Sequence, residues 1–164
     1  MNNSTNQIFF NKLKNLLHQQ IDRSSKSLQN TCVVFDIDGT LILPHNNKII
    51  KPIYQFYKYC ESIDIPIFII TARPGFPENI ERTVQMLRSY DINTPFYNFM
   101  NPELYYQNNQ REYKETARQN LLKNYDILMS LGDMQFDIDT YCNIGVLVKY
   151  YNDSSINYII GQNQ

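Results

Sequence analysis

The sequence predicts an α/β fold, a Rossmann-like three-layer α/β/α sandwich around a mostly parallel, five-stranded sheet. Apolar segments of strand length alternate with amphipathic helical segments along the chain, and such alternation is typical of parallel sheets with helices on both faces. The length of 164 residues fits one domain with a sizeable core. We expect an N-terminal tail and helix over 1–30, a core domain over 31–150, and a C-terminal tail over 151–164 that packs on the core.

The expected elements follow from local patterns taken in chain order. After a loose tail over 1–7, apolar side chains at helical spacing over 8–21 predict an amphipathic helix that packs on the domain or on a partner chain. Buried-type apolar runs predict five strands, at 31–36, 65–71, 95–99, 125–131 and 145–149. Periodic apolar positions predict three further helices, at 52–60, 78–90 and 110–124, with a loop over 101–110.

The stretch from Val33 to Leu41 carries the strongest chemical signal. An apolar strand runs into two acids at alternate positions, Asp36 and Asp38, and then into Gly39 and Thr40. In open α/β sheets, ligands bind at this end of the strands. Two carboxylates this close repel each other unless a cation offsets them, and Mg²⁺ is the simplest counter-charge for an oxygen-only site. Gly39 permits a tight turn whose backbone amides can approach an anion.

Three later positions place further polar groups where strands and helices meet. Thr71 ends the second expected strand, where its hydroxyl can bond a phosphate oxygen. Lys114 and Arg118 are four residues apart on a helix and project from one side of it. Asp133 and Asp137 follow the fourth strand directly after Gly132. Neighbouring parallel strands would bring these groups to the same edge of the sheet as Asp36.

In this order, the four sets resemble the four motifs of the haloacid dehalogenase (HAD) superfamily of phosphohydrolases over about residues 31–149. The segments 71–73, 113–118 and 132–137 resemble its class III acid phosphatase branch, which includes bacterial class B and C acid phosphatases and plant vegetative storage proteins. The connection after Leu41 is too short for a helical cap domain, so we expect a HAD-like core that is capless or has a minimal cap.

The resemblance assigns a role to each matching residue. Asp36 would be the nucleophile that forms an aspartyl-phosphate, and Asp38 would be the general acid and base. Asp137 would bind the metal through water or orient Lys114. The residues implied for phosphate binding are Thr71, Ala72, Lys114 and Gly39. The residues implied for Mg²⁺ binding are Asp36, Asp38 (through its backbone carbonyl), Asp133 and Asp137.

These roles predict a Mg²⁺-dependent phosphomonoesterase that acts on a nucleotide or another small phosphate ester. Its candidate substrate contacts are Arg73, Tyr105, Tyr106 and Arg118, with the tyrosines suited to stacking on a base. One alternative is a nucleic-acid end-processing 3′-phosphatase, which would need a basic groove. Another is a non-catalytic HAD-fold binding or storage protein. The complete acidic set favours an enzyme, because a fold alone does not require like charges at a sheet edge.

Composition restricts partners and compartment. With 15 basic and 16 acidic residues and a net charge of −1, the chain has no overall attraction for nucleic acid or an anionic membrane. It contains no apolar run of transmembrane length and no signal-peptide core. Three widely spaced cysteines form neither a zinc motif nor a disulfide framework. We therefore expect a cytoplasmic protein without a membrane partner, and the N-terminal helix is a candidate homodimer interface.

Overall fold

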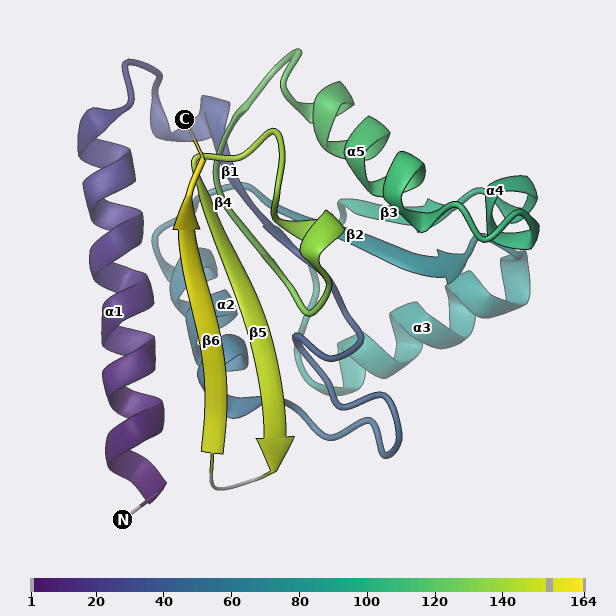
Figure 1. The fold of residues 1–164 in the computed structure, drawn as a ribbon, viewed down its shortest axis with the longest axis horizontal. Coiled ribbons are helices and arrows are strands. Elements are labelled where there is room, and N and C mark those ends of the chain that lie inside the picture. The colour runs from purple at the N-terminus through teal and green to yellow at the C-terminus, as the bar shows by residue number, and fades with distance from the viewer. Residues whose placement is uncertain (1, 153–154, 164) are drawn as a thin grey trace.

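A six-stranded sheet forms the middle layer of the computed structural model, which describes residues 2–152 and 155–163 (Figure 1). The strand order is β3-β2-β1-β4-β5-β6. The first five strands are parallel, and β6 is antiparallel to β5. The strands are β1 (Thr31–Phe35), β2 (Ile67–Pro74), β3 (Tyr97–Met100), β4 (Asp126–Gly132), β5 (Ile144–Asn152) and β6 (Ser155–Gln162). The mostly parallel α/β fold is confirmed.

The sheet has one strand more than predicted, because the expected C-terminal tail forms β6. Ile159 pairs with Leu147, and Ile160 pairs with Val146. Side chains along residues 156–160 alternate between covered and exposed, which is the period-two pattern of a strand with one covered face. The mixed Tyr, Ile and Asn composition concealed this pattern. Positions 153–154 and 164 of the expected tail lie outside the described residues.

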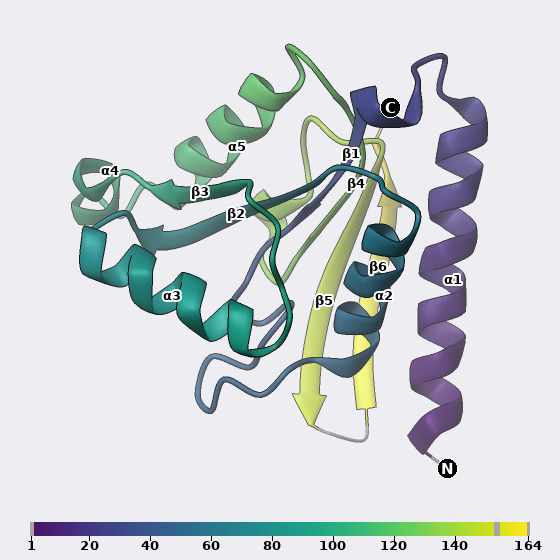
Figure 2. The same cartoon turned by 180° about the vertical axis from the view of Figure 1, so that it is seen from behind.

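Helices cover both faces of the sheet (Figures 1 and 2). One face packs against α1, α2 and α3 around a large apolar core, and the other packs against α5 around a smaller core. The helices are α1 (Asn2–Arg23), α2 (Lys51–Ser62), α3 (Pro77–Ser89), α4 (Pro102–Tyr106) and α5 (Gln110–Leu121), with single-turn helices η1 (Leu28–Asn30) and η2 (Gln135–Asp137). No helix in the described part of the chain combines the length and apolar character that a membrane span requires.

The N-terminal helix is part of the core. It begins at Asn2, so the expected loose tail is helical apart from Met1, which lies outside the described residues. Phe9, Leu13 and Leu17 are fully buried, and the ring of Phe9 stacks on Tyr158 of β6 at 3.9 Å between centroids. The apolar stripe of α1 therefore packs on its own chain, which was one of the two predicted alternatives.

The topology brings three strand ends together. Because β1 lies between β2 and β4, the carboxyl ends of these strands meet at the middle of one sheet edge. Residues 36–50 connect β1 to α2 through turns and isolated bridges, so this connection contains no cap domain. The expected loop over 101–110 contains α4 instead, because the Asn101 side chain accepts a hydrogen bond from the Glu103 amide at 2.8 Å and Pro102 opens the helix.

The packing of α1 predicts a contrast between two apolar positions on the same helix. Leu13 is fully buried, whereas Ile8 is 64% exposed. Leu13→Ala should lower the free energy of unfolding by about 2–5 kcal/mol, because it leaves a cavity in the core. Ile8→Ala should change it by less than about 0.5 kcal/mol. Urea unfolding monitored by circular dichroism measures both values, and equal effects would contradict this packing.

Candidate active site

Asp36 is held at the end of β1 by the neighbouring strand. All five residues of β1 are buried, and the Asp36 amide donates to the Leu131 carbonyl of β4 at 2.9 Å. The β1–β4 hydrogen-bond ladder therefore extends one residue beyond the strand and fixes the backbone of Asp36. The apolar run before this acid thus has a direct structural consequence: it fixes where the carboxylate lies.

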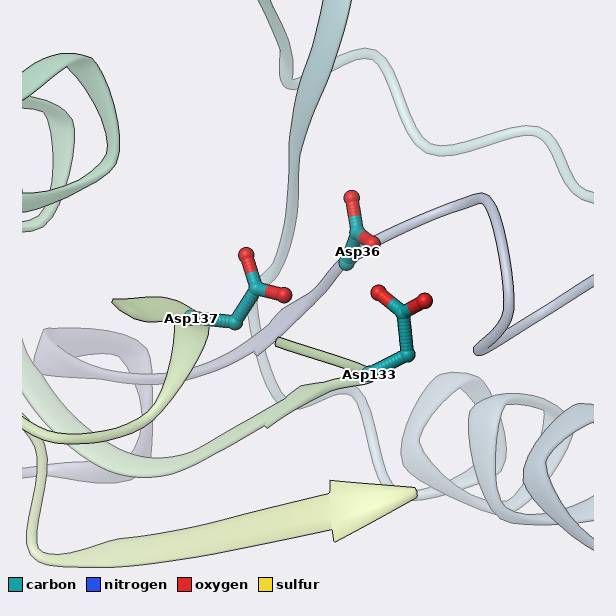
Figure 3. A group of neighbouring side chains, drawn as sticks. All are labelled: Asp36, Asp133 and Asp137. Atoms are coloured by element: carbon teal, nitrogen blue, oxygen red, sulfur yellow. The ribbon is translucent and has the colours of Figure 1, made fainter. Parts of the chain in front are cut away.

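Three carboxyl groups converge at this point. Asp36 follows β1, Asp133 follows β4 and Asp137 lies in η2, and each offers an oxygen within 4.8 Å of the others. Figure 3 shows the three side chains directed toward a common space. An oxygen-only donor set of this kind suits a hard divalent cation such as Mg²⁺. The sequence had predicted all three residues as metal ligands.

A buried lysine partly neutralises this group, which we call the carboxylate cluster (Asp36, Asp133 and Asp137). Lys114 of α5 is only 2% exposed. Its ammonium lies 2.7 Å from Asp36 Oδ1 and 2.8 Å from Asp137 Oδ1, and it also donates to the Ile70 carbonyl of β2 at 2.7 Å. The ammonium thus makes two hydrogen bonds, to Asp36 and to the Ile70 carbonyl, and an ion pair with Asp137. Lys114 joins four elements of the fold at one point.

The electrostatics of the cluster favour an added cation. Burial raises the pKa of Asp36 well above its usual range, and the nearby acids Asp137 and Asp133 raise it further against the opposing effect of Lys114. Burial, together with Asp137, raises the pKa of Asp133 to about 6. Burial alone would lower the pKa of Lys114, but Asp36 and Asp137 outweigh it, so that pKa is raised. The Lys114 ammonium therefore remains charged, but its single positive charge does not offset the repulsion among the three carboxylates.

The second acid of the motif is held by a different cation. Arg73, the residue before the last one of β2, donates from Nε to Asp38 Oδ2 at 2.9 Å and from Nη2 to Asp38 Oδ1 at 2.8 Å. The hydrogen bonds to Asp38 raise the pKa of Arg73 against the opposing effect of burial. The remaining nitrogen, Nη1, donates to the hydroxyl of Thr83 on α3 at 3.1 Å. Thr83 was not predicted from the sequence.

Two glycines allow the acids to approach one another. Gly39 has φ +73°, and a Cβ there would lie 2.4 Å from Asp133 Oδ2. A Cβ on Gly132 would lie 2.1 Å from the Cβ of Asp137. Gly39 was predicted to bind phosphate. Its amide instead donates to the Ile42 carbonyl at 2.8 Å, so it is not available to a phosphate. The role of Gly39 is to leave room for Asp133.

The acids open into a cleft of about 350 Å³. Most of its wall was predicted from the sequence, including Ala72, Arg73 and Tyr105, but Pro74, Gln110, Met134 and Phe136 were not. Phe136 lies inside the acidic motif between Asp133 and Asp137, so its position in the sequence could have suggested it. The lining residues are Asp36, Asp38, Ala72, Arg73, Pro74, Tyr105, Gln110, Lys114, Asp133, Met134, Phe136 and Asp137.

Three predicted site residues, Thr71, Tyr106 and Arg118, do not line the cleft. Thr71 is fully buried inside β2, three residues before the strand ends at Pro74, and its hydroxyl accepts a hydrogen bond from the Arg73 amide at 3.2 Å. Tyr106 is 76% exposed and lies beside Tyr105 rather than in the wall of the cleft. Arg118 is 1% exposed.

Arg118 was predicted to contact the substrate, and the structure contradicts this. Its guanidinium donates to the carbonyls of Phe136 at 2.7 Å and Thr140 at 2.9 Å. The side chain therefore fastens η2 and the following turn to α5, and it is not available to a substrate. The helical spacing from Lys114 correctly placed both cations on one side of α5 but could not show that a loop covers the second one.

Comparison with known families agrees with this geometry. The family model described as HAD superfamily, subfamily IIIB (acid phosphatase), matches residues 44–156, which is more than half of the chain. The chain belongs to this family. Membership in this acid phosphatase family favours phosphomonoester hydrolysis as the activity of the chain. The matched segment includes Thr71, Lys114, Asp133 and Asp137 and begins after Asp36 and Asp38.

Solved structures confirm the fold at greater distance. Six chains are similar, and one belongs to the "Structure of the Pnkp1/Rnl/Hen1 RNA repair complex", with a TM-score of 0.57 and 18% sequence identity. That alignment covers 69% of this chain and 39% of the other chain, so this chain spans about two fifths of the length of its structural neighbour. At this identity the likeness concerns the fold alone. A search of curated proteins found no significant match.

The raised pKa of Asp133 predicts how stability depends on pH without metal. Between about pH 4 and 6 the folded state holds a proton that the unfolded chain releases, because the pKa rises from 3.8 to about 6 on folding. The free energy of unfolding should therefore fall as pH rises through this window. Asp133→Asn should make the fall shallower in thermal unfolding with a chelator present. Asp22→Asn, at an exposed acid of α1, should leave the pH dependence of stability unchanged. An unchanged slope in Asp133→Asn would contradict the raised pKa of Asp133.

Proposed function

We propose that this phosphatase hydrolyses phosphomonoesters with Mg²⁺ through an aspartyl-phosphate on Asp36. The observation that carries the proposal is the position of Asp36, which lines the cleft with Lys114 and Asp133 beside it and Asp38 two residues further on. A carboxylate nucleophile, a counter-charge for the phosphoryl oxygens and a second acid for proton transfer are the groups this reaction requires.

In the first step, a carboxylate oxygen of Asp36 attacks phosphorus, and the bond from phosphorus to the ester oxygen breaks. Asp38 gives its proton to the departing oxygen, which leaves as an alcohol. In the second step, Asp38 takes a proton from water, the water oxygen attacks phosphorus, and the acyl-phosphate bond breaks to restore Asp36. Lys114 offsets the negative charge of the phosphoryl group throughout, as a fixed, dry cation.

The residues present fit a divalent metal. Asp36, Asp133 and the backbone carbonyl of Asp38 would hold Mg²⁺, which when bound supplies positive charge to the cluster and to the phosphoryl group. Both oxygens of Asp137 have partners, Oδ1 with Lys114 at 2.8 Å and Oδ2 with the Met134 amide at 3.1 Å. This supports a role for Asp137 in orienting Lys114.

Aromatic side chains at the mouth of the cleft support a nucleotide as the substrate. Tyr105 lines the cleft and is 42% exposed, so part of its side chain is accessible from the cleft. Its neighbour Tyr106 lies 5.9 Å away, and Phe76 lies 6.1 Å from Tyr106, between ring centroids. Exposed rings such as Tyr105 and Tyr106 beside a phosphate site suit a base, which stacks on aromatic faces.

A nucleic-acid 3′-phosphatase is the second candidate. The open, uncapped cleft favours it, because a large substrate could enter. The cations around the cleft weigh against a basic groove: Arg73 is paired with Asp38, Lys114 with the cluster, and Arg111 with Glu115 and Asp139. We therefore rank a mononucleotide first. Comparing hydrolysis of nucleoside monophosphates with that of a 3′-phosphorylated oligonucleotide separates the two.

A cytoplasmic location is also part of the proposal. Cys32, Cys60 and Cys142 are all buried free thiols. Burial raises the pKa of each, so the reactive thiolate form is disfavoured. Apolar cysteines that fill core positions without pairing fit a reducing compartment.

The nucleophile assignment predicts a selective loss of activity. Asp36→Asn should lower Mg²⁺-dependent hydrolysis of p-nitrophenyl phosphate by at least about a thousandfold, because the amide oxygen is a poor nucleophile. Asp22→Asn on α1 should keep full activity. Turnover is followed as released p-nitrophenol, with and without Mg²⁺. Metal-independent turnover, or activity retained in Asp36→Asn, would refute the proposed function.

The aromatic mouth predicts substrate-dependent effects of one change. Tyr105→Ala should raise KM for nucleoside monophosphates about tenfold or more, since stacking on an aromatic side chain contributes about 1–3 kcal/mol per base. It should leave KM for glycerol phosphate, which has no base, nearly unchanged. Steady-state kinetics on both substrates with the same enzyme preparation provide the comparison. A parallel rise for both would point to a general disturbance of the cleft.

A further inference from the structure

One buried hydroxyl accepts a hydrogen bond from the one Arg73 nitrogen that does not bind Asp38. Thr83 is 3% exposed, and its Oγ1 accepts from Arg73 Nη1 at 3.1 Å. The other two nitrogens of the guanidinium bind the two oxygens of Asp38 at 2.9 and 2.8 Å. The planar guanidinium is thus held on both sides, by a carboxylate and by a hydroxyl. This chain of contacts links the loop after β1, the end of β2 and the middle of α3.

The hydroxyl lies on a rigid support. Thr83 is near the centre of α3, and Leu87, one turn further along this helix, is fully buried in the main core. Asp38, in contrast, lies in a loop with its side chain 37% exposed. A short carboxylate on a loop can rotate about its side-chain bonds, and a bidentate guanidinium fixes its plane only if the guanidinium itself is fixed. Thr83 supplies that fixed point.

We propose that Thr83 is a positioning residue for proton transfer: by holding Arg73, it sets the orientation of the Asp38 carboxyl toward the leaving oxygen. The inference rests on the proposed function, in which Asp38 protonates that oxygen. Arg73, which the sequence suggested as a substrate contact, then acts mainly on Asp38. Thr83 touches neither the substrate nor the carboxylate cluster directly, so its effect on the reaction passes entirely through Arg73.

The proposal has a consequence that general damage to the fold would not produce. A poor leaving group, such as the alkoxide of glycerol phosphate, needs a proton as its bond to phosphorus breaks. A good leaving group, such as p-nitrophenolate, departs without one. Misorientation of Asp38 should therefore slow hydrolysis of the alkyl ester and leave the rate of hydrolysis of the aryl ester nearly unchanged. The kcat/KM value is the right quantity, because it covers the steps up to and including enzyme phosphorylation.

The experiment compares three variants on these two substrates with saturating Mg²⁺. Thr83→Val keeps the shape of the side chain and removes the hydroxyl, while Thr83→Ser keeps the hydroxyl. Thr94→Val is the matched control: Thr94 is also buried, but its hydroxyl donates to the Ile67 carbonyl at the start of β2, at the other end of the strand from the site. Thermal unfolding of each variant reports its folding.

Thr83→Val should lower kcat/KM for glycerol phosphate about tenfold or more and change that for p-nitrophenyl phosphate less than about twofold. Thr83→Ser should restore the alkyl activity, and Thr94→Val should show no selectivity. Equal losses on both esters, or no loss, would overturn the proposal. Arg73→Lys gives a second test if Thr83→Val does not fold, since an ammonium lacks the planar pair of nitrogens that fixes the plane of the carboxylate, and the same selective loss is expected.

Asp38→Asn separates this inference from the proposed function beneath it. If Asp38→Asn loses alkyl-ester activity selectively and Thr83→Val does not, the general acid stands and the positioning role of Thr83 is wrong. If Asp38→Asn itself shows no preference between the two esters, the assignment of Asp38 as general acid fails, and the role of Thr83 fails with it.

Discussion

The buried ammonium of Lys114 is the interaction on which the site depends. It lies between the carboxylates of Asp36 and Asp137 and against the carbonyl of Ile70, so α5, β1, β2 and η2 meet at one charged point. Charges this deep are tolerated only when they are paired and fully hydrogen-bonded. The parallel order of β2, β1 and β4 makes this pairing available, because it delivers the acids to the same sheet edge that α5 crosses.

The distribution of cations explains what else the site requires. Three carboxylates and one ammonium leave two negative charges when the cluster is fully ionised, and the raised pKa values of Asp36 and Asp133 reflect this excess. A divalent cation would balance it. Arg73 is separate, because it binds Asp38 with two nitrogens. In the proposed mechanism, the two protein cations would therefore serve two different tasks, Lys114 at the phosphoryl group and Arg73 at the acid that acts on the leaving group.

The sequence allowed much of this to be predicted, and the failures have physical causes. Asp36, Asp133 and Lys114 could be found because each follows or packs beside an apolar run whose direction is fixed by parallel pairing. The sixth strand and α4 were missed because their signals, a weak alternation over 156–160 and an Asn101 cap, are local and short. The roles of Arg118 and Thr83 depend on which loop or side chain contacts them in the folded protein. The periodicity of a single helix carries no information about such contacts.

The central claim is that Asp36 becomes phosphorylated during turnover. The most direct measurement is to quench the enzyme during hydrolysis of a good aryl phosphate, reduce the protein with borohydride and map its peptides by mass spectrometry. An aspartyl-phosphate is reduced to homoserine, so the account predicts homoserine at position 36 and at no other aspartate, and none without substrate. Turnover with an unmodified Asp36, or homoserine at another position such as Asp38, would contradict it.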